Sequence, residues 1–239
     1  MMTELTLPII GYMHSSYKEK FGIPRQPNLV QVESYIEMLA PYNDVLAFEG
    51  IEAFSHLWLL WQFHDNKNPE KTQFRPQVRP PRLGGNKKIG VFATRSMYRP
   101  SQIGLSVVRL KCVKKEGKSV RVYVTGSDLL DGTPIVDIKP YIHYSDAVIN
   151  AESGYAQDEP KRKSVIWSDR AIEQKQQLLM SEKLSVQTAQ ELEAVLSLDP
   201  RPAYQDDEAR VYKMKFAAVD IAFTVGETTV NITDVELET

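Results

Sequence analysis

The chain has 239 residues, of which 42% are hydrophobic and 25% are charged, and its formal net charge is -2. This composition is typical of a globular protein, and no stretch resembles a signal peptide or approaches the ~18 consecutive apolar residues of a membrane helix. Cys112 is the only cysteine, which excludes an intrachain disulfide and a thiolate zinc site and favours a reducing, cytoplasmic location.

Short strands are predicted along the N-terminal part of the chain. Residues 7–12, 103–110, 119–125 and 135–138 are rich in apolar and β-branched side chains. The lysine-rich segment 114–118 predicts a hairpin between the second and third of these strands. Many short strands with Gly and Pro between them favour a β-barrel or a β-sandwich.

Residues 54–63 form a longer, aromatic-rich stretch. Its two faces would carry Phe54, His56, Trp58 and Leu60 on one side and Leu57, Leu59 and Trp61 on the other. Both faces are mainly apolar, which predicts a strand that is buried on both sides. In this setting His56 is interpreted as a structural residue rather than a catalytic one.

The character of the chain changes after residue 148. Residues 149–167 are mostly polar and predict a linker. Ser168 is a plausible N-cap for a helix, and a second helix is predicted over residues 186–198, where the following prolines stop it.

Two strands are predicted near the C-terminus, over residues 211–225 and 229–237, with a tight turn at Gly226-Glu227 between them. The predicted organisation is therefore a mainly β domain over residues 1–148, a linker over 149–167, and a small α+β domain over 168–239.

Charge is distributed unevenly along the chain. Residues 67–121 contain fifteen Lys and Arg against two acids, whereas residues 151–239 contain seventeen acids against ten Lys and Arg. A basic block of this size is typical of a face that binds a polyanion such as RNA. A solvated basic surface is the alternative.

Most familiar catalytic signatures are absent. The sequence has no phosphate-binding P-loop, no G-x-S-x-G elbow and no dinucleotide-type G-x-G-x-x-G. The four histidines show no metal-ligand spacing, so no metal is expected; they are His14, His56, His64 and His143.

Four rigid, polar segments are the candidates for a binding site: residues 18–28, 75–92, 93–106 and 127–139. In the first, prolines bracket Arg25-Gln26 and fix the backbone around them. In the second, arginines alternate with prolines, which favours phosphate or RNA contact because arginine forks suit phosphate. Each segment could alternatively be an ordinary surface loop, and Asp131 could be an ordinary turn residue.

At these segments the sequence resembles the TsaA-like, or TrmO, family. The resemblance spans nearly the whole chain, and its motifs are specific in combination. The matching stretches are residues 17–21 (YKEKF), 24–27 (PRQP), 50–58 (GIEAFSHLW), 79–85 (RPPRLGG), 90–96 (GVFATRS), 131–134 (DGTP), 137–141 (DIKPY) and 199–204 (DPRPAY). One departure is Ser101-Gln102, where relatives usually carry Asn-Pro.

The resemblance implies a single-sheeted β-barrel that binds S-adenosylmethionine, and a homodimer. It implies methylation of N6 in N6-threonylcarbamoyladenosine, beside the anticodon of threonine tRNAs. The family's cofactor contacts fall on Gln26, Pro27, Asn28, His64, Asp65, Arg95, Leu105, Asp128, Leu129, Leu130 and Asp131.

Side-chain chemistry is compatible with that cofactor. The carboxylates of Asp65, Asp128 or Asp131 could accept hydrogen bonds from a ribose or an ammonium group, and Arg95 could hold the cofactor carboxylate. No general base stands out, and the candidates are Asp131, His64 and Tyr42. Contacts to RNA are expected from Arg25, Arg79, Arg82 and Arg99.

Two other functions remain open at this point. A non-catalytic RNA-binding or regulatory module would share the barrel and the basic block. A methyltransferase that acts on a small molecule would share the cofactor set.

Overall fold

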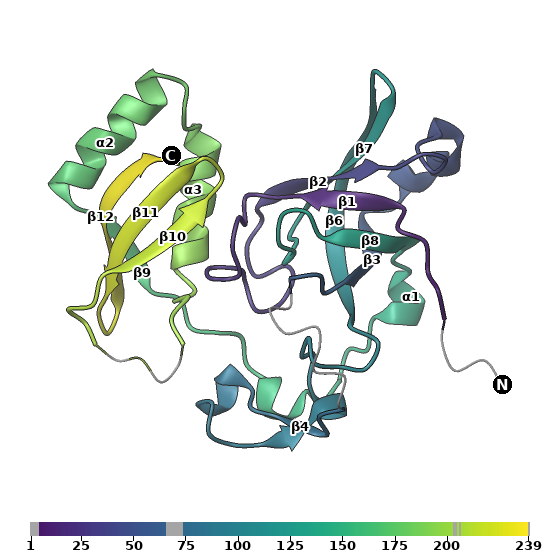
Figure 1. Cartoon of the computed structure of the whole chain (residues 1–239), viewed down its shortest axis with the longest axis horizontal. Coiled ribbons are helices and arrows are strands. Elements are labelled where there is room, and N and C mark those ends of the chain that lie inside the picture. The colour runs from purple at the N-terminus through teal and green to yellow at the C-terminus, as the bar shows by residue number, and fades with distance from the viewer. Residues whose placement is uncertain (1–4, 66–73, 203–204, 206, 239) are drawn as a thin grey trace.

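The computed structural model describes residues 5–65, 74–202, 205 and 207–238. Two packed regions lie beside each other, with a smaller segment of loops and short strands below them (Figure 1). One is a β-barrel and the other is a sheet covered by helices. The fold class predicted from the sequence is therefore confirmed.

The N-terminal region is a closed, single-sheeted barrel in which every neighbouring pair of strands is antiparallel. Closure removes the exposed sheet edges that an open sheet would leave. In spatial order the strands are β1 (Gly11–His14), β2 (Glu33–Met38), β7 (Ser119–Thr125), β6 (Ile103–Glu116), β3 (His56–Gln62) and β8 (Pro134–Pro140).

Alternating side chains fill the barrel, since successive residues of a strand point to opposite faces. Ile36, Leu57 and Val122 are among the residues with no exposed surface. Strand β2 was missed by the sequence analysis, because Glu33 and Glu37 alternate with its buried positions and mask the apolar signal.

The prediction that residues 54–63 are buried on both sides is wrong. In β3 only Leu57, Leu59 and Trp61 are buried, and the residues between them are half-buried. A closed single sheet has one interior, so the opposite face must look outward. Short helix α1 (His143–Asp146) supports that outer face, where Trp58 Nε1 donates to Asp146 over 2.9 Å.

The C-terminal region is a four-stranded sheet in the order β10-β11-β12-β9, with two helices. Its strands are β9 (Ser164–Trp167), β10 (Tyr212–Phe216), β11 (Val219–Val225) and β12 (Thr229–Leu237), and its helices are α2 (Asp169–Met180) and α3 (Val186–Leu196). Ser168 caps α2 as predicted, because its side chain accepts from the N–H of Ala171.

Two details of this region differ from the expectation. Residues 211–225 form two strands rather than one, because Ala217 adopts a φ of 53° and reverses the chain between β10 and β11. Strand β9 lies inside the predicted linker 149–167 and pairs in parallel with β12. The last four residues of that linker therefore belong to the sheet. The other domain boundaries given in the sequence analysis stay a prediction.

The segment over residues 15–32 joins the two regions. Tyr17, Val30 and Val32 are buried in the C-terminal core rather than in the barrel. The N–H of Ala217 donates to the carbonyl of Ser16 over 2.8 Å. Both regions consequently determine where this segment lies.

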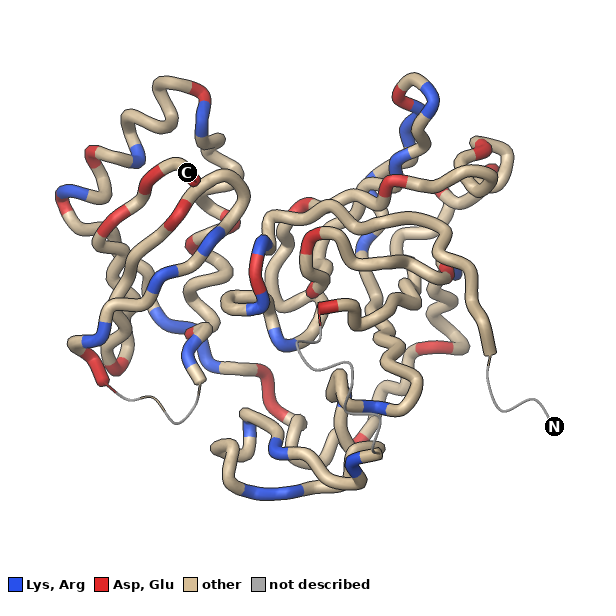
Figure 2. The backbone as a smooth tube through the Cα atoms, in the orientation of Figure 1, with Lys and Arg blue, Asp and Glu red and all other residues tan. Residues whose placement is uncertain are grey.

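A basic arm, defined as residues 74–101, projects from the barrel below the two regions (Figures 1 and 2). It contains only short elements: β4 (Gln77–Val78), β5 (Ile89–Gly90) and the 3-10 turns η3 (Pro81–Leu83) and η4 (Val91–Ala93). The remaining 3-10 turns are η1 (Val45–Phe48), η2 (Ile51–Ala53) and η5 (Gly154–Ala156). Residues 67–73 of the predicted basic block lie outside the described residues.

Candidate functional site

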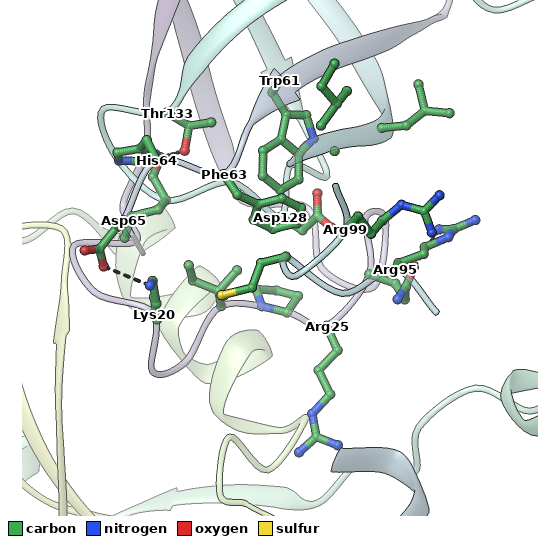
Figure 3. A pocket seen from close by; sticks show the side chains of 18 of the residues that line it. Lys20, Arg25, Trp61, Phe63, His64, Asp65, Arg95, Arg99, Asp128 and Thr133 are labelled. Carbon is green, nitrogen blue, oxygen red and sulfur yellow. Dashed lines mark hydrogen bonds and ion pairs between the residues drawn. The ribbon is translucent and has the colours of Figure 1, made fainter. Parts of the chain in front are cut away.

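A cavity of about 480 Å³ opens where one end of the barrel meets the segment 20–26 and the arm (Figure 3). This volume is in the range of pockets that hold cofactors and small ligands. The cavity is lined by Lys20, Ile23, Pro24, Arg25, Gln26, Trp61, Phe63, His64, Asp65, Thr94, Arg95, Met97, Arg99, Ile103, Gly104, Leu105, Asp128, Leu130 and Thr133.

A chain of hydrogen bonds fixes the barrel side of the cavity. Trp61 Nε1 donates to Ser106 Oγ over 3.0 Å, and Ser106 Oγ donates to Asp128 Oδ1 over 2.6 Å. Trp61 pairs with Gly104 across β3 and β6. A Cβ on Gly104 would lie 2.2 Å from the indole ring, so only glycine leaves room for it.

Asp128 carries the most perturbed carboxylate of the cavity. Burial raises its pKa to about 6, although the Ser106 hydrogen bond and the charge of Arg95 act in the opposite direction. The carboxylate is therefore mostly ionised at neutral pH. It places a negative charge on the barrel side of the cavity, where a cationic ligand group could be held.

Two polar pairs face each other across the mouth. Arg95 Nη1 donates to Gln26 Oε1 over 2.6 Å at one side. Lys20 Nζ lies 3.3 Å from Asp65 Oδ2 at the opposite side, close to His64 (Figure 3). The Gln26 bond leaves the remaining Arg95 donors available for an anionic ligand group.

Between the polar groups lies an apolar floor. Trp61 and Phe63 pack edge to face, with ring centroids 4.4 Å apart. Leu105 and Leu130 also line the cavity. A planar base such as adenine would fit against these apolar surfaces, while its edges meet backbone groups.

Seven residues predicted as cofactor contacts line this cavity: Gln26, His64, Asp65, Arg95, Leu105, Asp128 and Leu130. They come from five separate parts of the chain, and folding brings them together. Their assignment as cofactor contacts stays a prediction.

Four predicted contacts do not line the cavity: Pro27, Asn28, Leu129 and Asp131. Asn28 Nδ2 donates to the carbonyl of Val107 over 2.9 Å, and Pro27 precedes it in the same turn. The Leu129 side chain is fully buried in the barrel core.

Asp131 is occupied by two partners. Its carboxylate accepts from the N–H of Ser15 and from Lys18 Nζ, each over 2.9 Å. Of the three general-base candidates, His64 lines the cavity, whereas Asp131 and Tyr42 do not.

The arginines expected to bind RNA are distributed over two cavities. Arg99 lines the one described above, and Arg25 lines both, with its Nη2 donating to the carbonyl of Arg201 over 3.0 Å. Arg79 lines a second cavity of about 750 Å³ between the arm, the segment 20–29 and the C-terminal region. Arg82 lies near it on the arm, where it donates to the backbone carbonyl of Asp158.

Sequence reasoning missed part of the site, notably Trp61, Phe63, Ser106 and Met97. For Ser106, the sequence of β6 did carry a signal. In β6, Gly104 and Ser106 interrupt an otherwise apolar inward face, which is typical of a place where a ligand or another side chain approaches closely.

The described residues contain no group of three or more His, Cys, Asp or Glu side chains that could hold a metal ion. Within the same part of the chain, no helix has the length and apolar character needed to cross a membrane. The prediction that the protein needs no metal remains to be tested.

Comparison with known proteins gives a consistent result. The tRNA-methyltransferase O N-terminal domain family matches residues 12–147, and the TrmO C-terminal domain family matches residues 160–238. The chain is 45% identical over 208 residues to a protein of Escherichia coli named tRNA (adenine(37)-N6)-methyltransferase, which covers 87% of this chain and 86% of that protein.

Two further comparisons involve proteins of Pseudomonas aeruginosa. A putative S-adenosylmethionine-dependent methyltransferase is 45% identical over 223 residues, with 92% of both chains covered. The crystal structure of TrmO from that organism matches with a TM-score of 0.78 at 36% identity, covering 98% of this chain and 99% of that one.

Proposed function

This chain belongs to the tRNA-methyltransferase O family, and from that premise we propose that its substrate is N6-threonylcarbamoyladenosine next to the anticodon of threonine tRNAs. The broader activity follows from the family: the protein is an S-adenosylmethionine-dependent tRNA adenine N6-methyltransferase. The observation that carries the narrower proposal is a cavity whose lining combines the carboxylate of Asp128 with the arginines Arg25, Arg95 and Arg99.

The cavity suits the cofactor by the chemistry of its side chains. S-adenosylmethionine, when bound, supplies a methyl group on a sulfonium centre. Asp128 can hold a cationic group and Arg95 can hold a carboxylate. Trp61, Phe63 and Leu130 offer apolar surfaces that exclude water around an adenine.

Positioning is the main catalytic contribution that the described side chains can make, since the methyl group is already activated. The accepting N6 of the modified base lies between a purine and a carbamoyl group, so its lone pair is a weak nucleophile. Transfer would form the bond from the methyl carbon to N6, break the bond from that carbon to the sulfonium sulfur, which leaves as a neutral thioether, and release the N6 proton. Of the three general-base candidates only His64 lines the cavity, and we propose that it receives that proton.

The threonylcarbamoyl group offers a second group for recognition, because its carboxylate is an anion that an arginine guanidinium can bind through two hydrogen bonds. Arg25 and Arg99 both line the cavity. Arg99 Nη1 donates to the carbonyl of Thr94 over 2.9 Å, which orients the guanidinium and leaves its other donors for a ligand. Binding energy from this carboxylate would hold N6 in line with the methyl group.

The test compares two threonine tRNAs, one transcribed bare and one carrying the threonylcarbamoyl group, each incubated with labelled cofactor. Methyl transfer is expected only to the modified tRNA. Arg99→Ala should lower that transfer, and Arg99→Lys should restore little because it keeps the charge but not the fork. Comparable transfer to bare tRNA would refute the proposed substrate. Transfer to neither tRNA would favour a small-molecule methyltransferase or a non-catalytic RNA-binding module.

Cofactor binding without a metal is part of the same proposal. Isothermal titration calorimetry on EDTA-treated protein should show binding of S-adenosylmethionine in the micromolar range, about -8 kcal/mol. A requirement for added metal would contradict it.

We further propose a cytoplasmic homodimer. Large apolar side chains remain exposed next to α1, with exposed fractions of 89% for Tyr144, 72% for Val148 and 91% for Ile149. Such side chains are typical of a surface that another chain covers. Sedimentation velocity should give the mass of a dimer, and a monomer at micromolar concentration would contradict this proposal.

A further inference from the structure

The arm carries three large aromatic side chains that are unusually exposed. The exposed fraction is 52% for Phe74, 68% for Phe92 and 51% for Tyr98. Folding gains nothing from apolar surface that stays in water, and clustered exposure of this kind is typical of an interaction surface.

These aromatic side chains are interleaved with arginines. The rings of Phe74 and Phe92 stack with their centroids 6.1 Å apart. The guanidinium carbon of Arg99 lies 5.6 Å from the centroid of Phe92, and that of Arg75 lies 5.4 Å from the centroid of Tyr98. We call these five residues the aromatic platform.

The platform borders the cofactor cavity. Arg99 belongs to both, since it lines the cavity and covers Phe92. Met97, the residue before Tyr98, also lines the cavity. Figure 3 shows Arg95 and Arg99 together at one side of the cavity. A ligand that protrudes from the cavity on this side would therefore meet the platform.

Charge identifies the kind of partner. Residues 74–101 contain seven Lys and Arg and no Asp or Glu. Aromatic residues and Arg occur at protein interfaces as well, but seven cations without an acid match the phosphates of a nucleic acid, and single-stranded nucleic acid is bound by aromatic faces combined with cations. Aromatic rings and guanidinium planes stack on unpaired bases, while the cations pair with phosphates.

We propose that the aromatic platform stacks the unpaired bases that flank the target adenosine in the tRNA loop. This inference rests on the proposed function. An enzyme that reacts with a base must take it out of its stack, and unstacking its neighbours costs free energy. Stacking on Phe92 and Tyr98 offsets that cost, so the target base is held at the cavity while its neighbours lie on the arm.

The experiment measures binding of a fluorescent anticodon stem-loop carrying the modified base to three variants of Phe92. Phe92→Ala should weaken binding roughly 5- to 100-fold, the effect of losing one base stack. Phe92→Trp should bind as well as the unchanged protein, because it keeps a flat π-face. Phe92→Leu keeps apolar area without that face, and should resemble Phe92→Ala.

Three further readouts separate stacking from a general defect. The affinity for S-adenosylmethionine should not change in the Phe92 variants. The slope of log affinity against log salt should also be unchanged, because stacking releases no counterions, whereas Arg75→Ala should reduce that slope by ~1. Tyr12→Ala, which removes an exposed aromatic on β1 outside both cavities, should bind the stem-loop normally.

Two outcomes would overturn the inference. Normal binding by Phe92→Leu would mean that the platform provides apolar contact rather than base stacking. A change in sedimentation of Phe92→Ala would assign the platform to an interface with a second copy of the chain.

Failure of the proposed function would look different. In that case the unchanged protein binds the stem-loop in a Phe92-dependent way but transfers no methyl group to modified tRNA. If transfer occurs and the Phe92 variants bind normally, only the platform inference fails.

Discussion

The two sides of the cavity between the barrel and the arm are built in opposite ways. On the barrel side, Trp61, Gly104, Ser106 and Asp128 are held by the β3–β6 ladder and by consecutive hydrogen bonds. On the arm side, the lining residues lie in the irregular turns after η4, where Arg95 is exposed and Met97 and Arg99 are half-buried. A preorganised, desolvated side suits a small ligand that has the same structure in every catalytic cycle. An exposed, cationic side suits a large polyanion that brings its own water and counterions.

This contrast has energetic consequences. A change on the barrel side leaves buried polar groups without partners or forces close-packed atoms apart, and both cost free energy directly. A change on the arm side removes an exposed cation whose interactions are screened by salt. Substitutions on the barrel side should therefore alter folding and cofactor binding together, and substitutions on the arm outside the cavity should alter RNA binding alone.

The largest effect is expected from Gly104→Ala. The new Cβ would lie 2.2 Å from the Trp61 ring, so the indole must move, and overpacking at so close a contact costs about 3 kcal/mol or more. Urea denaturation and calorimetry should show lower stability together with weaker cofactor binding.

The matched control for this substitution is Gly90→Ala on the arm. No atom lies within 4 Å of the added Cβ, and Gly90 has a φ of -55° that any residue adopts. Gly90→Ala should keep the stability and the cofactor affinity of the unchanged protein. Equal losses of stability and cofactor affinity in Gly104→Ala and Gly90→Ala would contradict the distinction between the barrel side and the arm side.

The next effect concerns the dependence of stability on pH. Burial raises the pKa of Asp128 to about 6, so the folded protein binds this proton more tightly than the unfolded chain does. The ionised carboxylate therefore costs free energy above pH ~6, and this cost disappears as the pH falls toward ~4. It amounts to on the order of 2–3 kcal/mol.

Asp128→Asn removes this titration. At pH 8 the variant should be more stable than the unchanged protein, and at pH 4 the difference should vanish. Its cofactor affinity should fall, because the negative charge is lost. Denaturation curves at the two pH values measure the effect, and a constant difference in stability across this range would contradict it.

A smaller effect is expected from Ser106→Ala. The Ser106 hydrogen bond holds the pKa of Asp128 down, so removing it should move the titration of Asp128 upward by about one pH unit. Carbon-detected NMR of the side-chain carboxyl would follow the titration. Ser96→Ala on the arm side, whose hydroxyl accepts from the N–H of Tyr98, should leave the titration unmoved. An unmoved titration in Ser106→Ala would mean that the hydroxyl does not orient the carboxylate.

The smallest effects are expected on the arm. Arg79→Ala and Arg82→Ala should each reduce the slope of log tRNA affinity against log salt by ~1, with no change in cofactor affinity. Arg95→Ala should lower the cofactor affinity and leave the salt slope of tRNA affinity unchanged, because Arg95 donates a hydrogen bond to Gln26 at the cavity. Filter binding at several salt concentrations, together with calorimetry, tests this division. Equal effects of all three on cofactor affinity would contradict it.

Local chemistry explains which parts of the fold were predictable. The Ser168 cap and the Gly226-Glu227 turn depend on neighbouring residues and were identified correctly. Strand β2 and the one-sided burial of β3 were not, because burial depends on which face of a strand closes toward the interior. For the site, the resemblance indicated Gln26, Arg95 and Asp128 but not Ser106, whose role depends on what lies beside it.

The sequence by itself determined five of the six barrel strands, the Ser168 cap and the turn at Gly226-Glu227, and the family whose motifs the chain carries. Only the tertiary structure decided which of those residues meet. Trp61 and Ser106 are 45 positions apart, and Ser106 and Asp128 are 22 positions apart. Their contacts depend on the register in which β3 and β6 pair and on closure of the barrel. Closure is a property of the whole sheet, so no local pattern of residues encodes it.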